Sequence, residues 1–223
     1  MTDNAPRGAV SSRVVACGWT LTIAALASWS IEWVAAAFST VPYSFLDQTV
    51  SDLGATTCGP LDYVDPPVEV CSPAYAWVNG VWIVGGLTIA VTVLLLRDRL
   101  TRDRRRTGMS AAFVLAAAGV LQAAVGFVPL DVDLALHTIV ALVGFLAQNA
   151  GLVLAGIALA GRRRVLSLAA TVGGVIGLVA PLLLLAPSAW NLPIGLVERV
   201  ALYPFLMWLA AAGVVWAGRG PSG

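Results

Sequence analysis

Residues 74–106 read AYAWVNGVWIVGGLTIAVTVLLLRDRLTRDRRR, and this stretch decides the class of fold. Its first part, Ala74–Leu96, carries no charged side chain and is long enough, as a helix, to cross a hydrocarbon layer of about 30 Å. The arginine-rich part that follows is too costly to place in hydrocarbon and must end the span. The stretch therefore predicts a transmembrane helix with an arginine-rich connection at one end.

Five further apolar runs accompany this one. In chain order, with the first included, the runs cover about residues 14–38, 74–96, 109–130, 134–160, 165–186 and 195–217. They lack the alternating polar pattern of barrel strands and are about twice as long as such strands need to be. Apolar residues form 59% of the 223 residues and charged residues 11%, which excludes a large soluble catalytic domain. The sequence therefore predicts an all-α protein: a single polytopic membrane domain over residues 1–223, folded as a six-helix bundle.

The arginines predict how this bundle is oriented. Every arginine except Arg199 precedes the first run, follows the last, or lies in the second or fourth connection. The positive-inside rule then puts both termini in the cytoplasm and the loop over 39–73 outside. Cleavage of the first run as a signal peptide is the alternative, although the run is long and contains Glu32.

Composition also indicates the membrane in which the protein lies and the partners to expect. The chain contains no lysine, which is typical of a GC-rich bacterial genome, so we expect a protein of the bacterial inner membrane. The net charge of +1 excludes a nucleic-acid-binding surface, and membrane lipids are the expected partners. The sequence does not predict the oligomeric state.

The predicted outer loop holds two of the three cysteines, Cys58 and Cys71. In an oxidising exterior a disulfide between them would close a short loop and contribute about 3 kcal/mol in the chain-entropy model. Two free thiols are the alternative. Several prolines in the same loop favour an ordered, extended cover over another helix.

Polar side chains near the outer ends of the runs carry most of the functional information. A charged group in hydrocarbon is costly, so it faces the bundle interior, water or a partner. We therefore expect Arg199 to pair with Glu32 or Asp52, in a pocket open to the outside. The predicted ligand-binding residues of this pocket are Glu32, Ser51, Asp52, Asn79, Asp131, His137, Glu198 and Arg199.

His137 is the only histidine, and its role stays open between three interpretations. A structural hydrogen bond to Asp131, Asp133 or Glu198 is favoured, proton relay or acid/base chemistry comes second, and a metal site comes third. Because the H-E-x-x-H motif and a ligating cysteine pair are both absent, we predict no metal site and no cofactor. We expect Asp131 or Glu198 to lie within reach of His137, directly or through one water.

Several different short motifs are spread over most of the chain in a defined order. They are Ser51-Asp52-Leu53-Gly54, Asn79-Gly80, Gly126-Phe127-Val128-Pro129-Leu130-Asp131 leading to His137, and Glu198-Arg199 with Tyr203-Pro204 and Trp208. Their order resembles a bacterial membrane family known as domain of unknown function 998. The resemblance implies a six-helix integral membrane protein, distantly similar to eukaryotic proteins of the Frag1/DRAM/Sfk1 type, with no established reaction. Its motif positions fall on Asp52, Asn79, Asp131, His137, Glu198 and Arg199.

These observations favour a non-enzymatic membrane protein whose outward-facing pocket binds a lipid headgroup or small ligand in envelope or lipid homeostasis. Arg199 would face an anionic group of the ligand, and the carboxylates and His137 would bind its neighbours. The first alternative is an intramembrane lipid hydrolase with Asp131, His137 and Glu198 as candidate catalytic residues. It ranks second because one histidine is too few for the multi-histidine zinc hydrolases of membranes. A transporter and an accessory subunit are further alternatives.

Overall fold

The computed structural model describes residues 11–184 and 192–218, and it confirms the predicted all-α membrane fold. Six helices are long and apolar enough to cross a membrane. They are α1 (Ser12–Phe38), α2 (Tyr75–Leu95), α4 (Arg105–Phe127), α5 (Leu134–Leu159), α6 (Arg164–Leu184) and α8 (Ile194–Gly218). A short helix, α3 (Asp98–Thr101), lies in the arginine-rich connection.

The observed bounds differ most from the predicted ones in α4. This helix begins at Arg105 instead of Met109, because arginines continue a helix beyond the apolar part that hydropathy detects. It ends at Phe127 instead of Leu130, since the residue before Pro129 is disfavoured in helical conformation. The predicted end of the fifth run, at residue 186, lies outside the described residues, as do Arg7 and Arg219.

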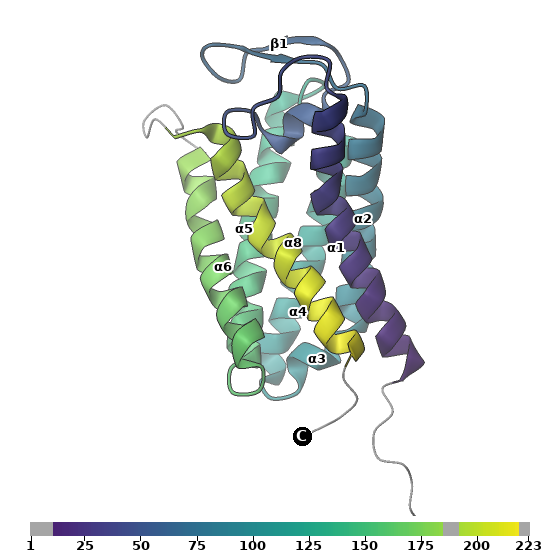
Figure 1. Ribbon diagram of the computed structural model, residues 1–223. Coiled ribbons are helices and arrows are strands. Elements are labelled where there is room, and N and C mark those ends of the chain that lie inside the picture. The colour runs from purple at the N-terminus through teal and green to yellow at the C-terminus, as the bar shows by residue number, and fades with distance from the viewer. Residues whose placement is uncertain (1–10, 185–191, 219–223) are drawn as a thin grey trace, which may run out of the picture.

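The six long helices form a closed ring in chain order. Each of α1, α2, α4, α5 and α6 packs against the next long helix, and α8 packs back against α1. Figure 1 shows the ring from the side, with the start of α1 and the end of α8 at the same end of the bundle. We call this the arginine end, because it also carries the connection between α2 and α4.

The contact between α1 and α8 is close because small residues line it. A Cβ atom added to Gly18 of α1 would lie 2.7 Å from the carbonyl oxygen of Gly213 in α8. Thr22 also donates its hydroxyl proton to the carbonyl oxygen of Ala210 at 3.1 Å. The backbones of α1 and α8 are therefore in close contact.

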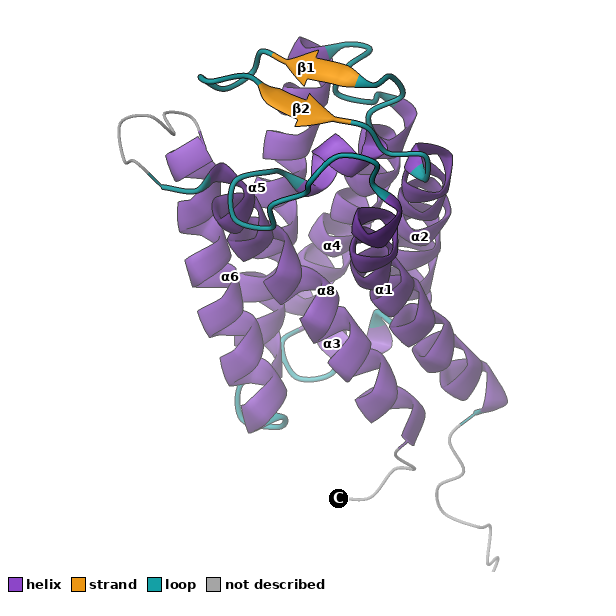
Figure 2. Cartoon of the chain, turned by 45° about the horizontal axis from the view of Figure 1, so that its top comes forward, coloured by secondary structure: helices purple, strands orange, loops and turns teal. Residues whose placement is uncertain are grey.

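The segment between α1 and α2 covers the opposite end of the bundle. We call this end of the bundle the hairpin end. Strands β1 (Gly59–Leu61) and β2 (Val68–Val70) pair there as a small antiparallel sheet, which Figure 2 shows lying across the helix ends. The sequence predicted this ordered cover. It did not predict the 3-10 helix η1 (Val50–Gly54), which begins with a capping box between Thr49 and Asp52 and packs against α1, α2 and α8.

Candidate functional site

Six polar side chains gather beneath this cover, at the hairpin end of the bundle. Each is at most 8% exposed. We call them the polar cluster: Glu32, Ser51, Asp52, His137, Glu198 and Arg199. They come from α1, η1, α5 and α8, so the fold brings together residues that are far apart in the sequence.

Arg199 and Glu32 form the ionic centre of the cluster, which confirms one of the two predicted pairings of Arg199. Arg199 Nε donates to Glu32 Oε1 at 2.7 Å, and Nη2 donates to the same carboxylate and to Tyr43 Oη. Nη1 donates to the carbonyl oxygens of Gln48 and Gly195. An arginine side chain has five N–H donors, and all five are used here.

This saturation changes the expected role of Arg199. With no N–H group left over, its guanidinium has nothing to offer an anionic ligand unless an existing contact breaks. Both oxygens of Glu32 are also occupied, because the second one accepts a hydrogen bond from Tyr203 Oη. The pair acts as a tie between α1, α8 and the outer segment, and the expectation that Arg199 faces an anionic headgroup loses its support.

A second group of contacts links Glu198, Ser51 and His137. Ser51 Oγ lies 3.1 Å from Glu198 Oε1 and 3.0 Å from His137 Nε2. Glu198 Oε2 accepts a hydrogen bond from the backbone N–H of Val50. Glu198 thus reaches His137 through the hydroxyl of Ser51, where the sequence predicted a direct or one-water contact.

The other ring nitrogen of His137 fixes how the imidazole is protonated. Nδ1 lies 2.6 Å from the carbonyl oxygen of Val128, the C-cap residue of α4. A carbonyl oxygen only accepts hydrogen bonds, so Nδ1 must carry a proton. In the neutral ring Nε2 then presents its lone pair to Ser51.

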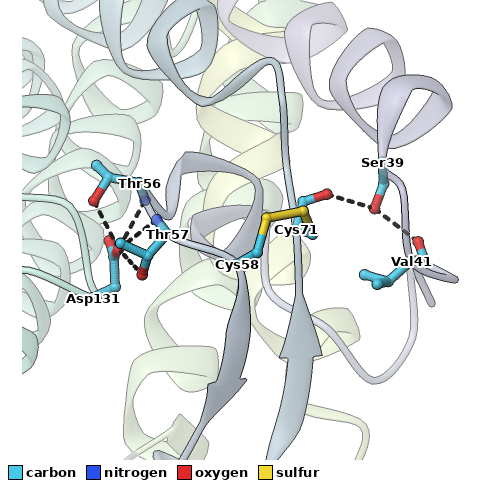
Figure 3. Close-up of a disulfide and its surroundings, with 7 residues drawn as sticks. All are labelled: Ser39, Val41, Thr56, Thr57, Cys58, Cys71 and Asp131. Carbon is cyan, nitrogen blue, oxygen red and sulfur yellow. Dashed lines mark hydrogen bonds between the residues drawn. A yellow bond between two sulfur atoms is a disulfide. The ribbon is translucent and has the colours of Figure 1, made fainter.

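Asp131 binds the outer segment. Its Oδ2 atom accepts hydrogen bonds from the backbone N–H and the hydroxyl of both Thr56 and Thr57, as Figure 3 shows. Burial alone would raise the pKa of Asp131, but these four contacts outweigh it and lower the pKa. Asp131 and His137 form no direct hydrogen bond with each other, so the predicted reach through one water stays a prediction.

Asp52 and Asn79 hold η1 in place. Asp52 accepts hydrogen bonds from the backbone N–H of Thr49 and from Tyr63 Oη at 2.8 Å. Burial raises the pKa of Asp52 to about 6, because the hydrogen bonds and the charge of Arg199 offset only part of the desolvation. Asn79 Nδ2 donates to the carbonyl oxygen of Gly54 at 2.8 Å. Both residues therefore position the segment that presents Ser51.

The predicted disulfide between Cys58 and Cys71 is present, and it closes the base of the small sheet (Figure 3). Beside it, Ser39 Oγ lies 2.8 Å from the carbonyl oxygen of Val41 and 3.3 Å from that of Cys71, which share its one hydroxyl proton. The hairpin is thus fastened to the end of α1 on one side and, through Asp131, to the start of α5 on the other.

Two cavities adjoin the polar cluster. The larger, of about 290 Å³, is lined by Ser51, Glu198 and His137 together with apolar side chains of α5 and α8. The smaller, of about 50 Å³, lies among α1, α2, α4, α5 and α8. Four residues line both cavities: Ser51, Ala141, Phe145 and Glu198.

A groove of about 800 Å³ lies on the outer side of the larger cavity, between the hairpin and the start of α8. Tyr63 and Ile194 line both the groove and the larger cavity. The groove and the larger cavity are therefore neighbours, with Tyr63 and Ile194 between them.

The sequence predicted no site role for the tyrosines or the backbone groups, although Tyr203 stands in one of the short motifs. Tyr43 and Tyr63 lie in an irregular segment whose sequence shows no periodic pattern, so their contacts with Arg199 and Asp52 had no signal. Tyr203 did have a signal in the sequence, because it follows Arg199 by one helical turn and so faces the Glu32 carboxylate that Arg199 binds. Within the described ranges, no three His, Cys, Asp or Glu side chains lie close enough together to hold a metal ion.

The fold and the buried site define a class of protein: a polytopic membrane protein with a polar cluster held among helices at one end of the bundle. The chain belongs to the DUF998 family of proteins of unknown function, whose family model matches residues 22–215. No curated protein and no solved structure matches it.

Proposed function

We propose that the protein binds an uncharged amphipathic molecule, with a hydrocarbon chain and a polar ester or hydroxyl group, in the cavities at its hairpin end. The observation that carries this proposal is that Ser51 and Glu198 line both cavities. Ligand sites are mostly apolar hollows with a few convergent polar groups. Here Ser51, His137 and Glu198 supply those groups, and the surrounding apolar side chains suit a chain.

The charge of the lining supports an uncharged ligand over the anionic headgroup that the sequence favoured. Among the residues that line the two cavities, within the described part of the chain, there is no lysine or arginine. An anionic group placed there would lie next to the Glu198 carboxyl with no lysine or arginine in the lining to stabilise it.

We further propose that the hairpin end faces the exterior of a bacterial inner membrane and that both termini are cytoplasmic. The arginine-rich connections at the opposite end support this orientation. The disulfide supports it as well, because disulfides persist in oxidising compartments. A lipid of the outer leaflet would then enter through the groove beside Tyr63.

A photo-crosslinking experiment tests the ligand site. The probe is a glycerol monoalkyl ether that carries a diazirine in its chain, since an ether is neutral and cannot be hydrolysed like an ester. In the detergent-purified protein, crosslinks located by mass spectrometry should fall on cavity residues such as Leu142 and Phe145. Excess neutral lipid should suppress them, and an anionic lipid should not.

A matched pair of variants completes this experiment. Ala141→Trp fills the junction of the two cavities, whereas Val143→Trp places the same side chain on the outer face of α5, where Val143 is 48% exposed. Crosslinking should be lost in the first variant and kept in the second. Equal crosslinking in both variants, or stronger competition by the anionic lipid, would contradict the proposal.

A further inference from the structure

The contacts of Ser51 pair an alcohol with a base whose orientation is fixed. Ser51 Oγ and His137 Nε2 are 3.0 Å apart, within the range of about 2.6–3.2 Å that joins a nucleophile to its general base. On the far side of the ring, the carbonyl oxygen of Val128 holds Nδ1–H at 2.6 Å. The imidazole therefore turns its basic nitrogen toward the serine.

The number of available protons shows that Glu198 is coupled to the pair of Ser51 and His137. A hydroxyl has one proton, so Ser51 cannot donate to His137 and to Glu198 at once. Both contacts are satisfied when Glu198 is protonated and donates to Ser51, which then donates to a neutral His137. They are also satisfied when His137 is an imidazolium and Glu198 a carboxylate. The two arrangements hold the same number of protons and differ by a shift through the Ser51 hydroxyl.

The setting of the serine points to the substrate class. Ser51 lines both cavities, and neither is lined by a lysine or arginine within the described ranges. A neutral carbonyl group bound at Ser51 would have room for its chain on one side and for its alcohol part on the other. Long-chain oxygen esters have this form.

We propose that Ser51 is a nucleophile and His137 its general base, and that together they cleave an uncharged long-chain ester. This inference rests on the proposed binding of an uncharged amphipathic ligand. It differs from the hydrolase considered from sequence, which used Asp131 and no serine. Asp131 is bound to Thr56 and Thr57 and takes no part.

The step balances with water as the only co-reactant. Ser51 Oγ forms a bond to the ester carbonyl carbon and its proton passes to His137 Nε2. The bond from carbon to the alcohol oxygen then breaks, and the alcohol leaves with the proton from Nε2, so that acyl-Ser51 remains. Water attacks the acyl carbon by the same proton route, releases the fatty acid and restores Ser51. Glu198, which is protonated when His137 is neutral, donates its hydrogen bond to Ser51 Oγ and so keeps the hydroxyl proton directed at His137.

Covalent labelling of the full-length protein in detergent tests this inference. The probe is a decyl fluorophosphonate, which phosphonylates activated serines with loss of fluoride. Intact mass should show one adduct, and peptide mass spectrometry should place it on Ser51. His137→Gln should slow labelling by about 100-fold or more, the usual contribution of a general base. Ser30→Ala should label at the wild-type rate, since Ser30 lines neither cavity and its hydroxyl donates to the carbonyl oxygen of Ala27 in the same helix.

Locating the adduct in the wild-type protein keeps the test valid even if Ser51→Ala fails to fold. An unlabelled wild type, an adduct on another residue, or unchanged labelling of His137→Gln would overturn the inference. Crosslinking to the alkyl ether probe separates the two proposals. Crosslinking without phosphonylation would remove the nucleophile and keep the ligand site, whereas loss of both would remove both.

Discussion

Arg199 uses every donor of its guanidinium, so even lysine should be a poor replacement. Lysine offers three donors from a single nitrogen and cannot reproduce the planar fork that holds Glu32. Because disrupting a buried ion pair leaves a charge without its full set of partners, Arg199→Lys should cost about 3 kcal/mol. The measurement is the thermal unfolding midpoint in detergent.

Arg162 provides the control for this substitution. It forms an ion pair with Asp103 at 3.3 Å, but both side chains are about one-third exposed. Surface pairs of this kind contribute between about 0 and 1 kcal/mol, so Arg162→Lys should leave the midpoint nearly unchanged. Equal midpoints for the two variants would contradict the role assigned to Arg199.

Asp52 should make stability depend on pH in a direction opposite to that of most carboxylates. Its folded pKa of about 6 lies above the ordinary value of 3.8, so between these values the folded chain keeps a proton that the unfolded chain has lost. Stability from this group is therefore complete below pH 3.8 and falls as the pH rises to about 6.

The variant Asp52→Asn isolates this effect, since asparagine does not titrate and other groups titrate in both proteins. The unfolding midpoint of the wild type, minus that of the variant, should decrease as the pH rises from about 4 to about 6. A difference that stays constant over this range would show that burial does not hold the proton on Asp52.

At the scale of single residues, the sequence predicted the polar side chains whose burial in an apolar run costs energy. It missed the site residues that carry no such cost. Glu32, His137 and Arg199 stood out because polar groups in an apolar run need partners. Ser51 was only one candidate among several, because a serine in a connecting segment carries no penalty. Its contact with His137 depends on how η1 is held by Thr49, Asp52 and Asn79, which no local pattern encodes.

The packing of α1 against α8 gives a prediction at the scale of elements. Gly18→Ala would place a Cβ atom 2.7 Å from the carbonyl oxygen of Gly213, so the two helices must move apart. Gly80→Ala makes the same change in α2, where nothing lies within 4 Å of the added atom. The first variant should lower the unfolding midpoint. The second should keep or raise it, because alanine favours helix by up to about 1 kcal/mol in water. Equal midpoints would mean that the contact between α1 and α8 is not close-packed.

The sequence predicted the elements well where a single property determines them. Apolar length gave the six helices, and the cysteine pair gave the disulfide of the hairpin. The start of α4 and the existence of η1 were missed for a common reason. Both depend on polar residues, arginine in one case and the capping pair of Thr49 and Asp52 in the other, which hydropathy treats as interruptions.

For the whole molecule, the arginines make the orientation testable. A reporter active only in the cytoplasm should be active when fused after Arg219 or inserted in the segment 102–106, and inactive when inserted near Asp62. A reporter active only outside should give the opposite pattern. Reversed activities would invert the bundle, and the groove beside Tyr63 would then open to the cytoplasm.

The ion pair between Glu32 and Arg199 also has a consequence for how the chain is made. These residues are 167 positions apart, so the ribosome completes α1 and four more long helices before it makes the partner of Glu32. Until α8 is made, Glu32 lacks its guanidinium partner and is expected to remain beside the water-filled insertion machinery. Release of α1 into lipid is therefore expected to wait for α8, and chains that stop short of α8 should be recognised and degraded by membrane proteases.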